Sequence, residues 1–358
     1  MIGRIKTLLV RFGGLGVALA ASGVLLGAPV GVGAMASEAP VPMAMAWPHA
    51  QRAVTLATLP DGSAYQPGMF FDARTSVGTA VTPDGKSLRL LIVGAGQPVR
   101  QLRSVPFSRG PSFQTFATAG GVLIWAEGSR GAIRMWRAGL RDREPPRLLT
   151  ADGGAATYGS DHDMVVDKGT LHWTVSRGDV TEVRSIPVIG GPVRTRTVPG
   201  RWKMSAWPWL IDGVTATAGT TRLRNIETNQ EVRVAATGSR SVTQCSPTWC
   251  RVVKLTRDGT RIDLMRPDGG GRRFVAGDTA QTVITDVVPL DGYEMYSKLG
   301  PDSALTGNVQ LLAYELATRR TVEISPDANR VSYRNGVLSW TTGSLNTFVW
   351  HALDLRTT

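Results

Sequence analysis

The sequence predicts an all-β fold, a β-propeller of seven blades, and three observations support this prediction. One module of apolar strands and glycine turns recurs between residues 53 and 358. Residues in this region show no sustained helical spacing of apolar side chains. Seven copies fit into it at about 44 residues each, close to the repeat length of known propellers. Six blades are the alternative count, because a fourth strand is hard to find in the first copy, between Val99 and Phe113.

The second strand of each module is the clearest signal. We assign it to seven apolar segments, several of which carry an aromatic residue: 88–93, 121–127, 169–175, 213–219, 248–254, 292–298 and 336–342. A turn such as Asp84-Gly85, Lys168-Gly169 or Asn335-Gly336 precedes most of them. These residue types tolerate the positive φ of two-residue hairpins. The modules are therefore predicted to be built from consecutive hairpins.

The remaining strands follow from the same pattern. Third strands are predicted at 133–140, 180–188, 221–228, 260–267, 309–316 and 348–355, and fourth strands at 146–150, 193–198, 230–235, 272–276 and 320–325. The seventh module lacks a fourth strand because the chain ends at Thr358, while Val54–Leu59 precedes the first module without a partner there. We expect Val54–Leu59 to complete the last blade and close the ring, which removes open strand edges.

Residues 1–36 have the three parts of a secretory signal peptide. Arg4, Lys6 and Arg11 form a positive start, residues 12–36 are uncharged, and an A-x-A pattern precedes Ser37. The uncharged stretch is also long enough for an uncleaved membrane anchor, so both interpretations stay open. Either one places the bulk of the chain outside the cytoplasm, secreted or anchored to the cell membrane, because the positive end stays inside.

The domain boundaries follow from these assignments. Residues 1–36 are the signal peptide or anchor, residues 37–52 are predicted to be a flexible spacer rich in Pro and Ala, and residues 53–358 form the propeller. Membrane contact is expected through residues 1–36 alone, if they are not cleaved.

The two cysteines agree with export. Cys245 and Cys250 lie in the fifth module, where they replace the glycine turn before the second strand. In an oxidising compartment a pair this close is predicted to form a disulfide, and two residues lack the further ligands that a structural zinc site needs. We therefore expect a disulfide that closes one hairpin, and no metal.

The chain is basic, with 40 Lys and Arg residues against 28 Asp and Glu and a net charge of +12. This charge favours an anionic partner such as a cell-envelope polymer, although an arginine-rich composition alone would also produce it. The basic residues form no stripe with interleaved aromatic residues, which excludes a nucleic-acid-binding module.

The segment TPDGKSLRLLI at 82–92 resembles the repeat of TolB-like propellers, and the modules DGYEMYS and LLAYELATRRTVEIS are similar to it as well. The resemblance covers residues 53–358 in pattern. It implies a non-enzymatic, extracytoplasmic, protein-binding module, and it transfers no binding residues. A Trp-Asp dipeptide is absent from the sequence, so a WD40 protein is not indicated.

Acidic residues near the predicted central channel form the first candidate site. Asp161, His162 and Asp163 lie at the start of the third module's first strand, and Asp286 lies on a first strand of the sixth. These side chains could converge at the channel mouth as a divalent-cation or hydrolytic site. The other interpretation is a polar turn, because neighbouring strand residues point to opposite faces. Motifs for a nucleophile, a phosphate loop or a dinucleotide cofactor are absent from the sequence, so no catalytic residue and no cofactor is assigned.

A group of tryptophans forms the second candidate site. Trp207 and Trp209 are two residues apart, which predicts that they share one strand face as a platform for a sugar or a peptide. Packing between blades is the alternative. Trp125, Trp173 and Trp340 recur at one position of the module and are predicted to be core residues.

Together these features favour a non-catalytic interaction module that binds an envelope protein or an anionic envelope polymer outside the cytoplasm. One alternative is a hydrolase or lyase with an acidic or metal site in the channel, so enzymatic activity stays open. A glycan-binding propeller is the other alternative.

Overall fold

We describe the protein from a computed structural model, which defines residues 39–141, 144–154, 159–213, 219–257, 259–300, 302–344 and 347–358. The predicted signal peptide or anchor at 1–36 lies outside the described residues, as do the start of the spacer and most of the strand predicted at 213–219. Residues Ala39–Thr358 form one compact unit.

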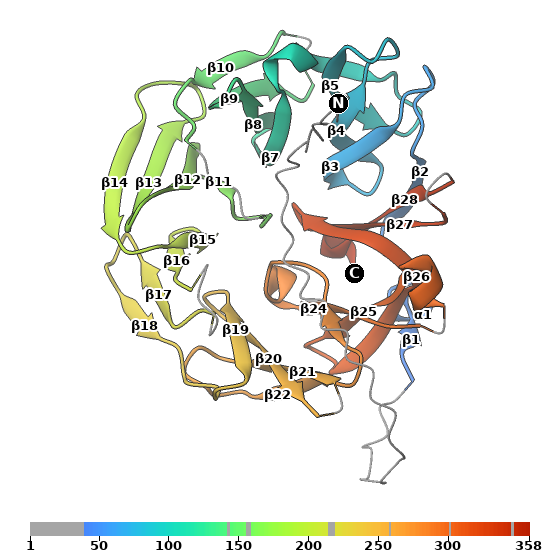
Figure 1. Ribbon diagram of the computed structural model, residues 1–358, viewed down its shortest axis with the longest axis vertical. Helices are drawn as coiled ribbons and strands as arrows, with labels where there is room; N and C mark the ends of the chain where they lie inside the picture. The colour runs from blue at the N-terminus through green and yellow to red at the C-terminus, as the bar shows by residue number, and fades with distance from the viewer. Residues whose placement is uncertain are drawn as a thin grey trace, which may run out of the picture. The chain divides into compact units, whose positions relative to one another are not determined.

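The described residues form an all-β fold of many four-stranded antiparallel sheets, as the sequence predicts (Figure 1). Two of these sheets are made of β3 Tyr65–Asp72, β4 Thr75–Val81, β5 Ser87–Gly94 and β6 Arg100–Pro106, and of β7 Ser112–Ala119, β8 Val122–Ser129, β9 Ala132–Gly139 and β10 Arg147–Thr150. The next two are made of β11 Met164–Asp167, β12 Thr170–Arg177, β13 Val180–Pro187 and β14 Arg194–Pro199, and of β15 Lys203–Ala206, β16 Trp209–Ile211, β17 Arg222–Asn225 and β18 Glu231–Arg233. The fifth contains β19 Ser241–Cys245, β20 Cys250–Thr256, β21 Gly259–Met265 and β22 Arg273–Ala276.

An eight-stranded sheet combines the two ends of this unit. Its C-terminal strands are β23 Gln281–Thr282, β24 Tyr293–Lys298, β25 Val309–Glu315, β26 Arg320–Arg334, β27 Val337–Thr342 and β28 Val349–Asp354. The long strand β26 pairs with β25 up to Ala328 and with β27 from Asn329 onward. The N-terminal strand β2 (Arg52–Leu56) pairs antiparallel with β28, which is the neighbour expected for this segment.

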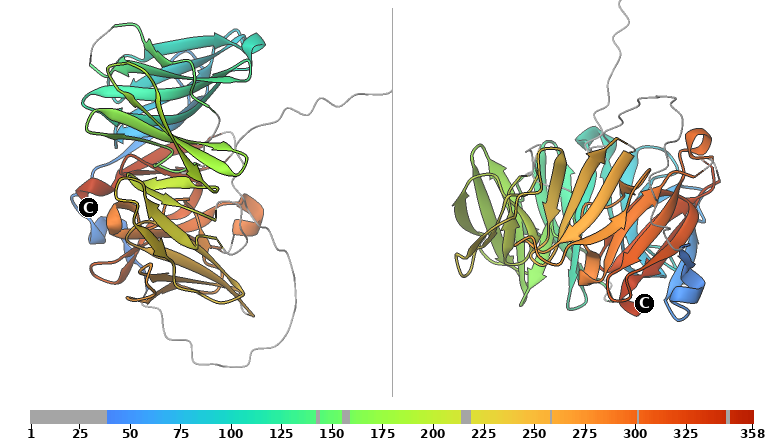
Figure 2. Two further views of the ribbon diagram at one scale, coloured as in Figure 1. Left: turned by 90° about the vertical axis from the view of Figure 1, so that its left-hand side faces the viewer. Right: turned by 90° about the horizontal axis from the view of Figure 1, so that it is seen from below.

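The sheets follow one another in chain order around a common centre (Figure 1). Strands β7, β11, β15 and β19 lie on the inner side, and β10, β14, β18 and β22 lie on the outer side. The views in Figure 2 show neighbouring sheets placed face to face. The core lies between them. One cluster joins Val77 and Leu90 of one sheet to Phe116 and Leu123 of the next. Burial of these apolar faces provides the main favourable term of folding.

The predicted core tryptophans Trp125, Trp173 and Trp340 are all buried. Each lies on the second strand of its hairpin pair, β8, β12 or β27. The indole nitrogen of Trp173 donates to the backbone oxygen of Gly153 at 2.7 Å. The recurrence of tryptophan at this position of the module therefore reflects packing between sheets.

Two modules are shifted by one strand from the predicted assignment. Segment 88–93, expected as a second strand, is β5, the third strand of its sheet, and β6 supplies the fourth strand that the sequence hides after Val99. The turn at Asp84-Gly85 thus joins β4 to β5. In the fourth module, residues 203–211 contain both β15 and β16, so the second strand is β16, which ends before the segment predicted at 213–219. These strands have three or four residues, too few to show clear alternation.

The segment before β2 packs on the eight-stranded sheet, which differs from the flexible spacer expected at 37–52. Strand β1 (Val41–Pro42) pairs parallel with β26, and the four-residue helix α1 (Met43–Ala46) follows it. Trp47 is buried in the same core as β25 and β26, and its indole nitrogen donates to Glu315. Burial of this large aromatic side chain, the β1–β26 pairing and a hydrogen bond from Arg320 to the Ala46 carbonyl hold this Pro- and Ala-rich segment in place.

Helices are short throughout the described residues. The second α-helix, α2, spans Ser303–Thr306, and three single turns of 3-10 helix occupy Phe107–Arg109, Pro289–Asp291 and Leu355–Thr357. In the described part of the chain, no helix is both long enough and apolar enough to span a bilayer.

Candidate functional site

A polar cluster brings together residues from distant sheets, including three of the predicted acidic residues. Asp286, in the loop between β23 and β24, accepts hydrogen bonds from the Ser160 hydroxyl and from the backbone N–H of Asp161, the latter at 3.0 Å. The Asp161 carboxylate accepts from the backbone N–H of Asn335 at 2.8 Å. Asp161 and Asp286 thus meet although 125 residues separate them. We call Ser160, Asp161, Asp163, Asp286 and Arg334 the central cluster.

Asp163 is the most enclosed carboxylate of the central cluster. One of its oxygens accepts from the backbone N–H groups of Gly159 and Ser160, at 2.9 and 3.3 Å. The same oxygen lies 3.8 Å from the Arg334 guanidinium. Arg334 also donates to the Ser160 carbonyl at 2.8 Å. The carboxylate therefore fixes the tight turn that leads into β11.

Asn335 connects the central cluster to the first sheet. Its side-chain amide donates to the carbonyl oxygen of Phe70 at 3.1 Å, while its backbone N–H holds Asp161. One asparagine directly after β26 thereby links β3 to the turn before β11. This arrangement ties the first, third and last parts of the unit together near the centre.

A fully buried ion pair contacts the backbone of the loop that contains Asp286. Arg251 on β20 and Glu294 on β24 are both 0% exposed and pair through the Arg251 Nε. Arg251 also donates to the carbonyl oxygens of Asp286 and Ile284, at 2.7 and 3.1 Å. The second Glu294 oxygen accepts from the backbone N–H of Val288. Removing either partner would leave the other charge buried without compensation.

The electrostatics of the central cluster follow from burial and from mutual repulsion. Burial raises the pKa of Asp161, and the nearby charge of Asp286 raises it further. Burial lowers the pKa of Lys203, which faces Asp286 and Asp163 from β15. Burial also raises the pKa of Tyr333, next to Asp161 and Asp286. Two cationic side chains, Arg334 and Lys203, thus lie close to three carboxylates.

Backbone donors hold the three carboxylates of the central cluster. Each of Asp161, Asp163 and Asp286 accepts at least one hydrogen bond from a backbone N–H. His162 contributes its backbone N–H, which donates to the Ser160 hydroxyl at 3.1 Å. Within the described residues, no group of three or more His, Cys, Asp or Glu side chains has the arrangement of a metal site.

The predicted platform of Trp207 and Trp209 is wrong in its geometry. The chain reverses at Trp207-Pro208, between β15 and β16, so the two rings do not share a strand face. Trp209 packs against the buried cluster that contains Ile211 and Cys250. Trp207 stacks on the imidazole of His172, with ring centroids 3.4 Å apart and planes 19° apart.

Trp207 and His172 line a pocket of about 260 Å³ between the third and fourth sheets. Its floor includes Val183 and Ile226, and Ser185, Arg194, Thr195, Arg196 and Glu227 also line it. Residues His172, Ser185 and Arg194 are direct cross-strand neighbours on β12, β13 and β14, so they form a row on one sheet face. We call this space the Trp207 pocket.

His172 is the feature of the Trp207 pocket that the sequence does not reveal. Its side chain is 7% exposed, and its Nδ1 has no hydrogen-bond partner among the described residues. Burial lowers its pKa to about 4, so the imidazole is neutral near pH 7. The sequence gives the hydrophobic strand around His172 but not the pairing with Ser185 and Arg194, because that pairing depends on register.

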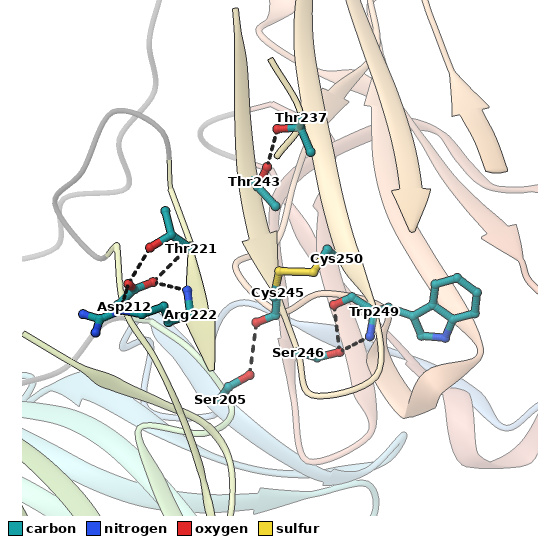
Figure 3. The surroundings of a disulfide bond; sticks show 10 residues. All are labelled: Ser205, Asp212, Thr221, Arg222, Thr237, Thr243, Cys245, Ser246, Trp249 and Cys250. Carbon is teal, nitrogen blue, oxygen red and sulfur yellow. Dashed lines mark hydrogen bonds and ion pairs between the residues drawn. A yellow bond between two sulfur atoms is a disulfide. The ribbon is translucent and has the colours of Figure 1, made fainter. Parts of the chain in front are cut away.

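The predicted disulfide between Cys245 and Cys250 is present and closes the β19–β20 hairpin (Figure 3). Both cysteines are buried. Ser246 and Trp249 form the turn, in which the Ser246 N–H donates to the Trp249 carbonyl at 2.7 Å. The hydroxyl of Ser205, on β15, donates to the Cys245 carbonyl at 3.2 Å. The bond therefore lies at a junction between two sheets.

No protein-family model and no curated protein matches the chain. Among solved structures it is similar to the β-propeller domain of the Trilobed protease from Pyrococcus furiosus, at 9% identity and a TM-score of 0.50, over 78% of this chain and 89% of that one. It is also similar to a prolyl endopeptidase, at 11% identity and a TM-score of 0.53, over 86% of this chain. The match covers 49% of the endopeptidase, so the chain spans about half of that protein's length.

TolB from Acinetobacter baumannii also resembles the chain, at 10% identity and a TM-score of 0.41, over 75% of this chain and 67% of TolB. Identities this low concern the fold alone. The likeness to the Trilobed protease domain shows a β-propeller fold, as the repeated module predicts.

Proposed function

We propose that this protein is a non-catalytic interaction module that works outside the cytoplasm and binds an envelope protein or an anionic envelope polymer. The observation that carries the proposal is that the carboxylates of the central cluster are already bound within the protein. Its carboxylates are engaged by backbone N–H groups, by Ser160 and by Arg334. A general acid or base needs a carboxyl group within reach of a substrate proton. Groups that fix turns and join sheets suit a structural role better.

An Asp163→Asn variant tests this role. The substitution would keep the size of the side chain but remove the charge beside Arg334, so we expect a lower thermal stability and unchanged partner binding. Asp179→Asn is the matched control, since the Asp179 side chain is 97% exposed. Both variants and the natural protein are assayed against a panel of glycoside, ester and peptide substrates. Turnover by the natural protein that disappears in a stably folded Asp163→Asn variant would instead establish the hydrolase alternative.

We further propose that the propeller has seven blades. Five four-stranded sheets account for five of them. The strand β26 pairs on both sides along successive halves, which supports two further blades in the eight-stranded sheet. The last of these would consist of the end of β26, β27, β28 and β2, so that the N-terminal strand closes the ring. β6 also supplies the fourth strand of the first module, whose apparent absence favours six blades, so it supports seven.

The proposed location outside the cytoplasm rests on residues 1–36 and on the disulfide. A buried pair of oxidised cysteines is typical of proteins that fold in an oxidising compartment. Mass spectrometry of the N-terminal peptide from the natural host distinguishes the two interpretations of residues 1–36. A first residue near Ser37 indicates cleavage, and an intact N-terminus on a surface-labelled protein indicates an anchor. An intact N-terminus on a protein that surface labels do not reach would contradict export.

A further inference from the structure

The Trp207 pocket has the features of a small-ligand site that is separate from the central cluster. Its volume of about 260 Å³ is slightly below the range of ordinary ligand pockets. It would therefore hold one or two rings of a larger molecule. The walls come from two sheets, with β12, β13 and β14 on one side and Trp207, Ile226 and Glu227 on the other.

Part of the pocket lining is aromatic and apolar. Trp207 and His172 stack with planes 19° apart, and Val183 and Ile226 add apolar surface. Such a lining suits the apolar face of a sugar ring, whose C–H groups pack against an indole. Stacking against His172 also fixes the indole, so little side-chain entropy would be lost on binding.

The polar groups of the pocket are those that bind hydroxyl groups. His172 is 7% exposed, has a buried Nδ1 without a partner among the described residues, and lines the pocket. Ser185 is its direct cross-strand neighbour. Glu227 adds an exposed carboxylate on the opposite wall. A neutral imidazole, a hydroxyl and a carboxylate together match a ligand that carries several hydroxyl groups.

The positive charge of Arg194 favours a ligand with an acidic group. Arg194, next in the row after Ser185, is exposed, and its guanidinium has no hydrogen bond or ion pair to another described residue. Arg196 already donates to the carbonyl of Ile226 and to Asn229. One available guanidinium suits a single acidic group. A polyphosphate or a nucleic acid would require more cationic side chains.

We propose that the Trp207 pocket binds a sugar unit that carries one acidic group, a carboxylate or a phosphate, within an anionic glycan. The sugar ring packs on Trp207, its hydroxyl groups meet His172, Ser185 and Glu227, and its acidic group pairs with Arg194. This inference rests on the proposed interaction function and specifies the polymer that the module would bind. It differs from a platform of two tryptophans, since Trp209 takes no part.

Titration of the full chain with defined oligosaccharides tests the proposal. The probes are trigalacturonate, the neutral galactotriose, and galactose 1-phosphate, and binding is measured by calorimetry and by saturation-transfer NMR. We expect the two acidic probes to bind and the neutral one to bind at least about tenfold more weakly, since a charge-assisted hydrogen bond is lost. Stronger binding of trigalacturonate would indicate a carboxylate ligand, and stronger binding of galactose 1-phosphate would indicate a phosphate. Equal binding of all three would overturn the proposal.

Two substitutions assign the binding to this pocket. Arg194→Gln lies at an exposed position and should fold normally, and we expect it to weaken the acidic probes about tenfold. Arg233→Gln, at an exposed arginine on the outer strand β18 of the next sheet, is the matched control and should leave binding unchanged. His172→Phe keeps the stacked ring without its nitrogens and should weaken every sugar probe. Equal effects of Arg194→Gln and Arg233→Gln would overturn the site.

Two further outcomes distinguish failure of the glycan inference from failure of the proposed non-catalytic function. Cleavage of trigalacturonate by the natural protein would contradict the non-catalytic function, although binding at Arg194 would still support the pocket. Absence of glycan binding, together with a protein partner captured by crosslinking in cells, would overturn the glycan inference and leave the interaction function in place.

Discussion

At the scale of single residues, buried polar groups determine the chemistry of this protein. Asp161, Asp163 and Asp286 are joined by backbone donors, while Arg251 and Glu294 form an ion pair that is closed to solvent. His172 is different, because it is buried against Trp207 with its Nδ1 unpaired among the described residues. The first two groups suit structural roles, and the third suits ligand binding.

His172 should make stability depend on pH. Its pKa is lowered from 6.5 to about 4 in the folded protein, so between these values the unfolded chain binds a proton that the folded chain does not. The free energy of unfolding should therefore fall as pH falls from 6.5 to 4, despite the opposing charge of Asp167. Urea titrations at several pH values measure this.

The variant His172→Phe should show a flatter dependence over the same pH window than the natural protein. His49→Phe, at an exposed position, is the control. Identical slopes for the natural protein and for His172→Phe would contradict the burial of a neutral imidazole.

Arg251 and Glu294 should be strongly coupled in stability. Arg251→Met leaves the Glu294 carboxyl buried without its partner and should lower the free energy of unfolding by about 3–5 kcal/mol. The double variant Arg251→Met/Glu294→Gln should lose less than the sum of the two single changes, because no unpaired charge remains. Chemical denaturation of all four proteins measures the coupling. Additive effects would mean that the two charges do not interact.

The central cluster shows which contacts the sequence pattern can predict and which it cannot. The sequence predicts that Asp161 and Asp286 could converge because both are assigned to first strands, and they do meet. Their assignment to first strands is wrong, since Asp161 lies in the turn before β11 and Asp286 lies in the loop between β23 and β24. The partners Asn335 and Arg334 could not be foreseen, because their contacts depend on how sheets far apart in the chain are arranged. Spacing alone also misplaces Trp209, since the turn at Pro208 breaks the alternation.

At the scale of elements, the fold is built from hairpins, and their turns are the features that the sequence predicts best. Most second and third strands lie within one or two residues of their expected bounds, as β12 and β13 do at 170–177 and 180–187. The failures are the segment 88–93, which is a third strand, and the short strands β15 and β16, where propensity and alternation give little signal. In such segments the neighbouring sheets decide the structure.

The disulfide should contribute modestly to stability. Its cysteines are five residues apart, and closing so short a loop restricts the unfolded chain by about 2 kcal/mol. Cys245→Ser/Cys250→Ser should thus remain folded, with a lower melting temperature. Thiol titration of the denatured natural protein should find no free thiols, since the described chain contains no free cysteine. Two free thiols in exported protein would contradict the disulfide.

At the scale of the whole unit, its N-terminal part pairs with the C-terminal strands. Strand β2 pairs with β28, β1 pairs with β26, and Trp47 lies in the core beside them. The sequence predicts the first of these pairings, because the last module lacks a strand. It does not predict the packing of residues 41–47, because a Pro- and Ala-rich stretch gives no periodic pattern.

Trp47 should hold the N-terminal segment onto the unit. Trp47→Ala removes a buried ring that contacts Tyr293 edge-on at 5.5 Å, and should cost about 3–5 kcal/mol. Limited proteolysis should then cut between residues 41 and 50 faster than in the natural protein. Trp47→Phe, which loses the hydrogen bond to Glu315 but keeps a ring, should lie between the two. Equal cleavage rates for all three proteins would show that this segment is not held by Trp47.

The central claim, that this protein binds a partner without transforming it, is tested most directly by crosslinking in the natural host. Tagged natural protein, Asp163→Asn and Arg194→Gln are crosslinked in cells, and the attached molecules are quantified by mass spectrometry. We predict one reproducible envelope partner that folded Asp163→Asn retains, and reduced capture in Arg194→Gln would in addition support the Trp207 pocket. Absence of any reproducible partner would contradict the central claim. Loss of capture in folded Asp163→Asn would also contradict it, by placing the functional site in the central cluster.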